Sequence, residues 1–401
     1  MIGPVSLDEV CISIVDCEHK TAPIDEAGEF FAVGTPAMRD GVIDYSQARR
    51  ISRDTFEKWT RRLSPRVGDL LFAREAPVGP IVRIPVGENV APGQRTVLIR
   101  PNPDVVDSRF LYYFLGSPMA QQRLQDRAAG STVAHLNVAD IRDFELGLLP
   151  ALEGQYAIAE VLGALDDKIA ANRKLAATAD ELARVHFREI SSRSVCLDEV
   201  GSAYDDVAVI GGGGTPKTTM SEYWDGDIPW ATPTDVTALD VPSIGSTARS
   251  ITEEGLANSS AKLYPAGSVL MTSRATIGAF AIAEEGIAVN QGFIVVNAKD
   301  PENQWWLFHD MRARVDEFIA HANGATFLEI PRGRFKTLPV AIPDRDVVAD
   351  FSAKAAELHR VSVSAATESR SLTTLRDALL PRLMSGELRV RDAEKSVEAV
   401  L

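Results

Sequence analysis

GSTVAHLNVADIRDFELGLLP, residues 130–150, is matched by GATFLEIPRGRFKTLPVAIP, residues 324–343, with one residue deleted. Each stretch opens on a glycine, carries apolar residues in its middle and closes on a proline, Pro150 or Pro343. A repeat with a period of roughly 195 residues is far longer than a solenoid repeat, so it indicates duplication of whole domains. The chain is therefore expected to hold two copies of one fold.

Other markers recur in the same order in both halves. Leu7-Asp8-Glu9-Val10 recurs as Leu197-Asp198-Glu199-Val200, and Ile51-Ser52-Arg53-Asp54 is echoed by Ile251-Thr252-Glu253-Glu254. GDLLF at 68–72 with APVG at 76–79 matches GSVLM at 267–271 with ATIG at 275–278. The two halves follow one plan.

A long helical pattern follows each closing proline. Apolar residues recur at heptad spacing, which predicts a helix-helix seam: Ile158, Leu165, Asn172 and Ala179 with Val161, Leu175 and Leu182, then Phe351, Leu358, Ala365, Leu372 and Leu379 with Val361 and Leu375. Each helix spans on the order of 50 to 60 Å. Because neither helix can bury its stripe alone, we expect the two to pair as an antiparallel coiled coil. Asn172 either fixes the register of that pair or lies at a solvated helix end.

The segments before the helices have the pattern of strands. GDLLFAR, RTVLIRP, GSVLMTS and GFIVVNA are short apolar or alternating runs bounded by glycine, proline and asparagine. The sequence therefore predicts an α/β (α+β) protein with two globular domains and two long antiparallel helices, related by a pseudo-twofold internal repeat. The expected boundaries are 1–150 and 191–343 for the globular domains, 151–190 and 344–386 for the helices, and 387–401 for a polar C-terminal tail.

Composition describes a soluble globular protein. The 401 residues are 45% hydrophobic and 24% charged, which favours two or three folded domains. There is no apolar run long enough for a membrane helix, and MIGPVSLDEV does not have the pattern of a signal peptide, so we expect no membrane partner and a cytoplasmic location. Cys11, Cys17 and Cys196 have no CxxC spacing, and His19 near Cys17 is an incomplete ligand set, so no metal site is expected.

The net charge of −14 argues against a nucleic-acid partner, but it is unevenly spread. Residues 1–150 carry 17 Lys+Arg against 20 Asp+Glu, whereas residues 196–343 carry 10 against 19. The window from Arg39 to Arg66 holds eight basic and four acidic residues, with Phe56 and Trp59 among them. This window is either a DNA-contacting surface or a solvated helix face with ordinary charge scatter.

The run GGGGTPK at 211–217 is a second candidate site. A phosphate-binding P-loop needs a glycine directly before the lysine, but Pro216 stands there and has no N–H to donate. The run therefore does not predict a nucleotide site.

These features together resemble the specificity (S) subunit of Type I restriction-modification systems over essentially the whole chain. The resemblance is carried by EYWDGDIPWATPTDV behind GGGGTPK, by DCEHKTAP, by AREAPVG and SRATIG, by QYAIAEVLGALDDKIAANRKL, and by the closing SLTTLRDALLPRLMSGELRV. The N-terminal part of the first domain departs from the pattern, because it has the sequence GEFFAVGTP where the second domain has Ile228-Pro229-Trp230. The resemblance therefore leaves the DNA target open.

The resemblance implies how such a chain works. Each globular domain is expected to read the major groove of one half of a split, asymmetric site in double-stranded DNA, with the helix pair setting the distance between the halves. Half-sites on one face of a duplex lie roughly 34 to 36 Å apart, within reach of such helices. The implied partners are two methyltransferase (M) subunits and restriction-translocase (R) subunits, which use S-adenosylmethionine, ATP and Mg. This chain is expected to bind no cofactor of its own and to be non-catalytic.

Candidate DNA contacts follow from residue type, because cations bind phosphate or guanine and Thr, Asn and Gln read base edges or phosphates. In the first domain they are Lys20, Arg39, Arg49, Arg50, Arg53, Arg61, Arg62 and Arg74; in the second they are Thr215, Lys217, Thr218, Thr232, Thr234, Arg249, Lys262, Arg274, Asn290 and Gln291. The glycine run is read as a mobile loop that lets backbone approach the duplex, or as a plain surface connection. Trp224 and Trp230 are expected to be core anchors.

Two other classes of function stay open. One is a non-catalytic coiled-coil adaptor that ignores DNA, and the other is a nucleotide-binding enzyme that uses Gly211 to Lys217.

Overall fold

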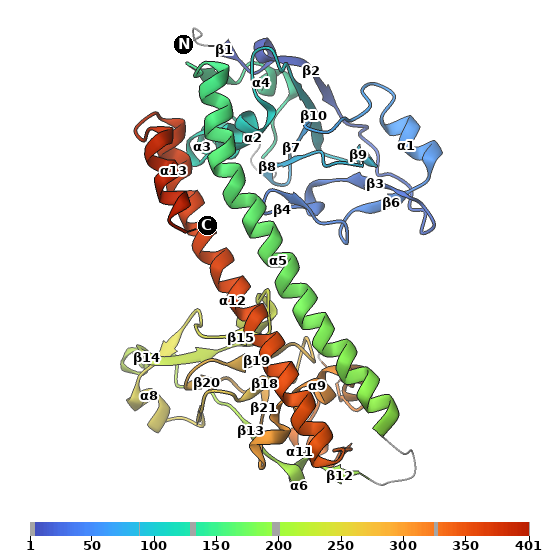
Figure 1. The fold of residues 1–401 in the computed structure, drawn as a ribbon, viewed down its shortest axis with the longest axis vertical. Coiled ribbons are helices and arrows are strands. Elements are labelled where there is room, and N and C mark those ends of the chain that lie inside the picture. Colours follow the sequence, from blue (N-terminus) through green and yellow to red (C-terminus); the bar gives the residue numbers. More distant parts are fainter. Residues whose placement is uncertain (1–4, 88, 129–133, 195–200, 325–327, 401) are drawn as a thin grey trace. The chain divides into compact units, whose positions relative to one another are not determined.

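The computed structural model describes residues 5–87, 89–128, 134–194, 201–324 and 328–400. It divides into two compact units, which are named unit 1 (Met1–Ile169 with Ser371–Leu401) and unit 2 (Ala170–Arg370). The division falls inside both long helices, α5 (Leu152–Ser194) and α12 (Arg345–Met384) (Figure 1). Each unit therefore contains a length of both helices.

Unit 1 is built on a four-stranded antiparallel sheet in the order β2-β10-β7-β8 and a three-stranded sheet in the order β6-β3-β9. Its strands are β1 (Val5–Ser6), β2 (Cys11–Asp16), β3 (Phe30–Val33), β4 (Met38–Arg39), β5 (Val42–Ile43), β6 (Arg49–Ile51), β7 (Leu70–Arg74), β8 (Val78–Arg83), β9 (Val90–Pro92), β10 (Thr96–Pro101) and β11 (Glu145–Gly147). Its shorter α-helices are α1 (Arg53–Trp59), α2 (Ser108–Gly116), α3 (Pro118–Arg127), α4 (Val138–Arg142) and α13 (Val390–Glu398).

Unit 2 has the same plan, with a five-stranded sheet in the order β13-β21-β18-β19-β15 and a four-stranded sheet in the order β16-β14-β20-β17. Its strands are β12 (Ser202–Ala203), β13 (Ala208–Gly212), β14 (Trp224–Ala231), β15 (Ser243–Ile244), β16 (Ser250–Ile251), β17 (Leu263–Tyr264), β18 (Val269–Thr272), β19 (Phe280–Ala283), β20 (Ile287–Val289), β21 (Phe293–Ala298) and β22 (Pro339–Val340). Its shorter α-helices are α6 (Tyr204–Val207), α7 (Pro233–Thr237), α8 (Glu253–Ala257), α9 (Gln304–Ala313), α10 (Val315–Ala320) and α11 (Arg332–Lys336).

The predicted repeat is confirmed by the strand pairing of the two units. Strand β3 pairs antiparallel with β6 and parallel with β9, and β14 pairs in the same two senses with β16 and β20. The echo between 51–54 and 251–254 is a strand end followed by a helix cap, because Ser52 Oγ accepts from Thr55 N at 3.3 Å and Thr252 Oγ1 accepts from Gly255 N at 3.0 Å.

One marker of the repeat needs correction. The predicted match of Leu7–Val10, Leu197-Asp198-Glu199-Val200, lies outside the described residues, as does Cys196. The structural counterpart of Leu7–Val10 is Tyr204–Val207. Ser6 N donates to Glu9 at 2.7 Å and Ala203 N donates to Asp206 at 3.0 Å, and in both units the residue between them, Leu7 or Tyr204, is buried.

In unit 2 the helices α5 and α12 run antiparallel. Asn172 Nδ2 donates to Glu368 Oε2 at 2.9 Å, and Ser362 Oγ donates to the Ala176 carbonyl at 3.0 Å. The ring of Phe187 packs against that of Phe351, with centroids 5.7 Å apart. Residues later in α5 thus contact residues earlier in α12, as expected for an antiparallel pair. Asn172 is a buried member of the seam.

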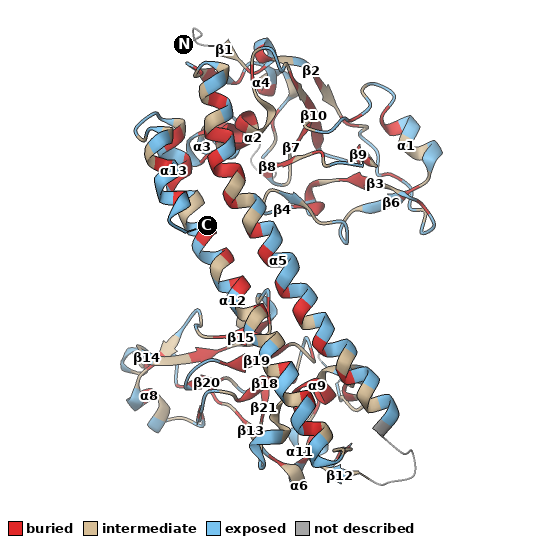
Figure 2. Ribbon diagram, in the orientation of Figure 1, coloured by how far each residue is buried: buried red, intermediate tan, exposed pale blue. Residues whose placement is uncertain are grey.

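The predicted seam is confirmed at most of its positions and wrong at two of them. Nine of the fourteen predicted members are buried, namely Ile158, Val161, Leu165, Asn172, Ala179, Phe351, Ala365, Leu372 and Leu379. Leu358, Val361 and Leu375 are partly buried. Leu175 and Leu182 are 49% and 53% exposed, which corrects their assignment to the seam. Buried Ala176 and Ala183 take their place one residue later, so the buried stripe continues on one side of α5 (Figure 2).

The helix pair also anchors the core of unit 1. Leu165 of α5 lies in one cluster with Leu372 and Leu379 of α12. Asp166 accepts hydrogen bonds from Tyr113 of α2 at 2.5 Å and from Arg376 of α12 at 2.7 Å. A single carboxylate thus connects the globular part of unit 1 to both long helices.

The C-terminal range differs from the expected polar tail of 387–401. It contains α13, whose Ala393 and Val397 are buried in the same cluster as Leu165. Alternating polar residues hide this from a composition argument, because two small apolar residues four apart are enough to seat a short helix. Among the described residues, no helix has the length and apolarity needed to cross a bilayer.

Candidate nucleic-acid interface

Unit 1 carries a cavity of about 820 Å³ beside its three-stranded sheet. Phe31 of β3 and Arg49 and Arg50 of β6 lie along one part of it, and Gln94 and Arg95, just before β10, lie along another. Arg50 lies over the ring of Phe31, with 5.6 Å from its guanidinium carbon to the ring centre. The cavity therefore combines guanidinium groups, amides and an aromatic face, which is the chemistry that contacts DNA.

The charge of this cavity is positive. Three arginines, Arg49, Arg50 and Arg95, line it together with one carboxylate residue, Glu26. Tyr45 also lines it, and its hydroxyl can donate a hydrogen bond. Two predicted contacts, Arg49 and Arg50, are thus brought together here.

The other predicted cations of unit 1 lie elsewhere, and most have partners within the protein. Arg61 pairs with Glu18 at 2.8 Å, and Arg62 donates to the Asp16 carbonyl at 3.3 Å. Arg39 donates to the Pro36 carbonyl at 3.3 Å, Arg53 lies over Phe30 at 5.1 Å, and Lys20 is exposed. The DNA-contacting role of these residues stays a prediction.

Arg74 has a structural environment. Its side chain is 11% exposed, and it donates to Asp16 at 3.2 Å and to the Leu136 carbonyl at 3.2 Å. It also lies 3.4 Å from Nδ1 of His19. Its hydrogen bonds fasten the end of β2 to the segment before α4, so it is poorly placed to reach a duplex.

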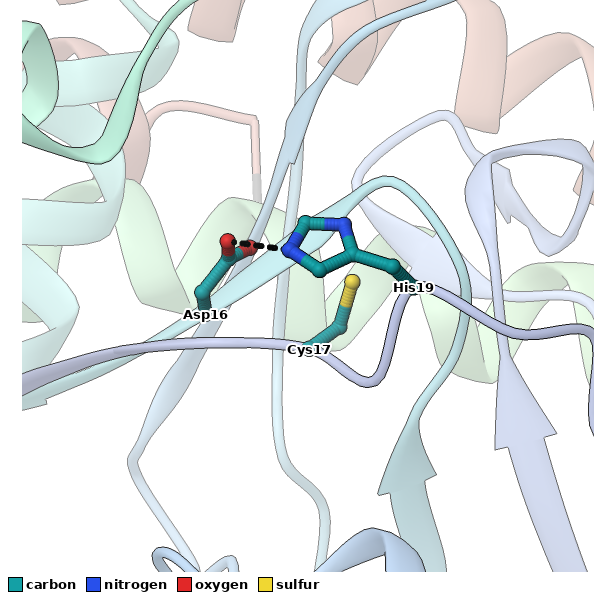
Figure 3. A group of neighbouring side chains, drawn as sticks. All are labelled: Asp16, Cys17 and His19. Atoms are coloured by element: carbon teal, nitrogen blue, oxygen red, sulfur yellow. Dashed lines mark ion pairs between the residues drawn. The ribbon is translucent and has the colours of Figure 1, made fainter.

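The same neighbourhood holds a group of possible metal ligands, Asp16, Cys17 and His19, whose ligand atoms lie within 4.8 Å of one another (Figure 3). His19 Nε2 pairs with Asp16 at 3.0 Å. Burial raises the pKa of the Cys17 thiol, and the Arg74 guanidinium already occupies Asp16. A protonated thiol and an adjacent fixed cation both disfavour a metal ion, so we read the group as a structural ion-pair cluster.

In unit 2 the predicted residues divide by position. Thr215 Oγ1 donates to Gln291 Oε1 at 2.6 Å, so two of them meet on the surface. Arg249 lies over the ring of Trp224, 3.5 Å from its centre. Lys217, Thr218, Thr234 and Lys262 are exposed, whereas Thr232, Arg274 and Asn290 are partly buried. Thr232 is the N-cap residue of α7, and its backbone N and its hydroxyl donate to Asp235 Oδ2 at 2.7 and 2.6 Å.

The glycine run is neither a mobile loop nor a plain surface connection, which corrects both readings. Gly211 and Gly212 belong to β13, and Gly214 N donates to the Val289 carbonyl at 3.0 Å. A Cβ on Gly213 would collide with the carbonyl oxygens of Val289 and Asn290. Glycine is needed here because two backbone segments pass in direct contact. Trp230 Nε1 donates to the Gly214 carbonyl at 3.0 Å, and both Trp224 and Trp230 are buried, as predicted.

Sequence reasoning missed several residues that line this cavity, namely Thr21, Tyr45, Gln47, Gln94 and Arg95. The signal for one of them was present. VAPGQRT at 90–96 and IAVNQGF at 287–293 align without a gap, which places Gln94 opposite the predicted contact Gln291.

The comparisons with known proteins agree with this architecture. A family described as Type I restriction modification DNA specificity domain matches residues 5–179 and 201–347. The Type I restriction enzyme MjaIX specificity subunit of Methanocaldococcus jannaschii is 35% identical over 159 residues, which is 39% of this chain and 37% of that relative. The HindI specificity subunit of Haemophilus influenzae is 24% identical over 189 residues, 46% of this chain and 41% of the relative. The matched stretches thus span less than half of these two relatives.

A solved structure shares the fold over nearly the full length. The crystal structure of the Type-I restriction-modification system S subunit from M. genitalium superposes with a TM-score of 0.60 at 16% identity, covering 95% of each chain. The family match takes in most of the chain and falls once on each half of the duplication. The chain therefore belongs to the family of Type I restriction-modification DNA specificity proteins.

Proposed function

We propose that this chain is the DNA specificity subunit of a Type I restriction-modification complex and that it reads a bipartite, asymmetric site in double-stranded DNA. Each unit reads one half-site, and the shared helices set the distance between the halves. The chain supplies recognition and no chemistry of its own.

One observation carries this proposal: a single scaffold occurs twice with unlike surfaces. Strand β6 of unit 1 carries Arg50, which lies over Phe31, whereas the equivalent strand β16 of unit 2 carries Ser250 at that position. An arginine precedes this position in both units, but Arg49 lines the cavity and Arg249 is held on Trp224. Two recognition domains with the same fold and different side chains recognise different base sequences. A palindromic site would require identical surfaces.

The partners follow from what this chain does not supply. Methyltransferase (M) subunits would bring S-adenosylmethionine and flip the target adenine, and restriction (R) subunits would bring ATP and Mg. In unit 2, Leu175, Leu182 and Val185 form an exposed apolar row along α5, at 49%, 53% and 44% exposure. A row on the outer face of a helix suits a helix-packing partner, and we assign it to the methyltransferase subunit.

The acidic chain needs those partners to hold DNA. At a net charge of −14 it repels phosphate over most of its surface, and the positive cavity of unit 1 is small. Alone, the chain should bind duplex DNA weakly, because it neutralises few phosphates. Tight, sequence-specific binding by the isolated chain at physiological salt would contradict this division of labour.

Methylation mapping tests the proposal directly. The full chain is expressed with its methyltransferase partner in a host without other methylation, and modified adenines are read across the genome. We expect one split motif with adenines methylated in both halves, and replacing residues 1–150 by those of another specificity subunit should change one half only. No motif, or a palindromic one, would refute it.

The adaptor alternative makes the opposite prediction in the same strain. A coiled-coil adaptor without DNA readout would still retain a partner through α5 and α12, but no sequence motif would be methylated. A shift of the melting temperature by ATP would instead support nucleotide binding.

A further inference from the structure

One hydrogen-bonded pair of surface residues occurs twice in the chain. In unit 1, Thr21 Oγ1 donates to Gln94 Oε1 at 3.2 Å, and in unit 2, Thr215 Oγ1 donates to Gln291 Oε1 at 2.6 Å. All four side chains are exposed. The partners are 73 residues apart in one unit and 76 in the other, so the pairs result from the fold and not from local sequence.

The two pairs occupy equivalent places in the scaffold. Thr21 follows strand β2, which pairs with β10, and Thr215 follows strand β13, which pairs with β21. Strands β10 and β21 are the last in the sequence within their sheets. Each glutamine lies in the connection into that last strand, β9 to β10 or β20 to β21. The backbone agrees, because Gly93 N donates to the Val33 carbonyl at 2.8 Å and Asn290 N donates to the Ala231 carbonyl at 3.0 Å.

The bond fixes what the glutamine offers to a ligand. With its oxygen held by the threonine hydroxyl, the amide presents Nε2 and its two N–H donors. Such a group binds hydrogen-bond acceptors, and both phosphate oxygens and base-edge acceptors are of this kind.

A guanidinium group accompanies each pair, but it comes from a different position. In unit 1, Arg95 follows Gln94 directly and lies 3.6 Å from Glu75. In unit 2, Gly292 stands at the position of Arg95. Arg274 stands at the position of Glu75, because both residues directly precede an alanine of positive φ, Ala275 at 59° and Ala76 at 50°. Arg274 reaches the same loop, since a Cβ on Gly292 would lie 3.3 Å from its Nε.

We propose that each Thr–Gln pair, with its adjacent arginine, binds a phosphodiester of the DNA backbone and fixes the position of its unit on the duplex. This inference rests on the proposed function. The Thr–Gln pair is the same in both units, whereas neighbouring positions such as Arg50 and Ser250 differ. What two different half-sites have in common is their phosphate backbone, so a repeated element fits a repeated ligand. In unit 1, Thr21, Gln94 and Arg95 also line the positive cavity.

The test uses the full chain in complex with its methyltransferase partner. Gln94→Ala, Gln291→Ala, Gln94→Glu and Gln291→Glu are compared with Gln122→Ala, a control on α3 whose amide donates to Asp126 at 2.8 Å. Binding is measured by fluorescence anisotropy on a duplex that carries the mapped motif and on one with both half-sites scrambled. Melting temperatures establish that the variants are folded.

We expect each alanine variant to weaken binding about five-fold on both duplexes. The glutamate variants should weaken it further, because a carboxylate repels phosphate, and Gln122→Ala should leave binding unchanged. Glutamine is neutral and releases no counterion, so the salt dependence should stay as in the wild type, whereas Arg95→Ala and Arg274→Ala should each reduce the slope by about one.

Two results would overturn the inference while leaving the proposed function intact. One is wild-type affinity in all four glutamine variants. The other is a loss of affinity confined to the motif duplex, together with a changed base sequence in one half of the methylated motif. That result would show that the glutamines contact bases. If the wild-type complex methylates no motif, the proposed function itself fails and this inference fails with it.

Discussion

Replacing Arg312 by methionine should destabilise unit 2 by removing a charge partner from a mostly buried carboxylate. Arg312 of α9 holds Asp180 of α5 through two hydrogen bonds of 2.7 Å each. The two side chains are 14% and 23% exposed. Methionine keeps much of the apolar stem near Phe308, whose ring centre lies 5.0 Å from the guanidinium carbon. The change therefore isolates the loss of the ion pair.

The expected loss lies between two limits. Removing one partner of a fully buried pair costs about 3 to 5 kcal/mol, and an exposed pair is worth less than about 1 kcal/mol. At these exposures we expect about 2 to 3 kcal/mol, which lowers the melting temperature of a unit of this size by about 5 to 10 °C. Arg184 also lies near enough to Asp180 to favour its charged form, so one cation still stabilises the carboxylate in Arg312→Met.

The assay is denaturant unfolding followed by tryptophan fluorescence. Four of the five tryptophans, at positions 224, 230, 305 and 306, belong to unit 2, so the signal reports mainly on it. Arg312→Met, Asp180→Asn and the double variant form a cycle, and we expect a coupling energy of about 1 to 2 kcal/mol.

The pH dependence gives an independent check. Burial favours the protonated acid of Asp180, but the hydrogen bonds and charge of Arg312 outweigh burial and hold its pKa below the usual range. A lowered native pKa stabilises the fold above the unfolded pKa of about 3.9, and this stabilisation is lost as pH falls through the native pKa. The advantage of the wild type over Arg312→Met should thus be constant from pH 7 to about 5 and shrink below about 4. A loss under about 0.5 kcal/mol, or a gap that widens in acid, would refute the reasoning.

Three further outcomes follow from packing. Leu165→Ala should cost about 3 kcal/mol in unfolding experiments, whereas exposed Leu182→Ala should cost less than about 0.5 kcal/mol yet weaken capture of the methyltransferase subunit in a pull-down. Gly213→Ala should lower the melting temperature by several degrees, because its Cβ meets two carbonyl oxygens, while Gly333→Ala in α11, with open space around it, should not. Ser52→Ala removes the cap of α1 and should cost about 1 kcal/mol by denaturant titration.

The sequence predicted the fold well, because a duplication is visible without any structure. It failed at the seam because a helical repeat of 3.6 residues admits steps of three and four. Leu175 and Leu182 were assigned to the seam by heptad spacing, but the helices in unit 2 approach through small residues, Ala176 and Ala365, and the two leucines are exposed. Residue size alone cannot show how closely two helices approach.

The candidate site was predicted less well, for a different reason. A list of cations cannot show which ones already have partners within the protein. Arg74 is bonded to Asp16, 58 residues away, and Arg249 lies on Trp224. The alignment of the two halves marks Gln94, but it does not show that Gln94 bonds to Thr21, because the two residues are 73 positions apart. The pair becomes visible only when the two units are compared.

The distribution of the helices explains why neither half of the duplication is complete by itself. The first part of α5 belongs to unit 1 and the rest to unit 2, while the first part of α12 belongs to unit 2 and the rest to unit 1. The core of unit 1 therefore contains Leu379 and Val397 from the far end of the chain. A change in the length of one helix would break the pairing in one unit unless the other helix changed equally. Each unit therefore needs residues from both halves of the chain to complete its core, as Leu379 does in unit 1 and Phe187 does in unit 2.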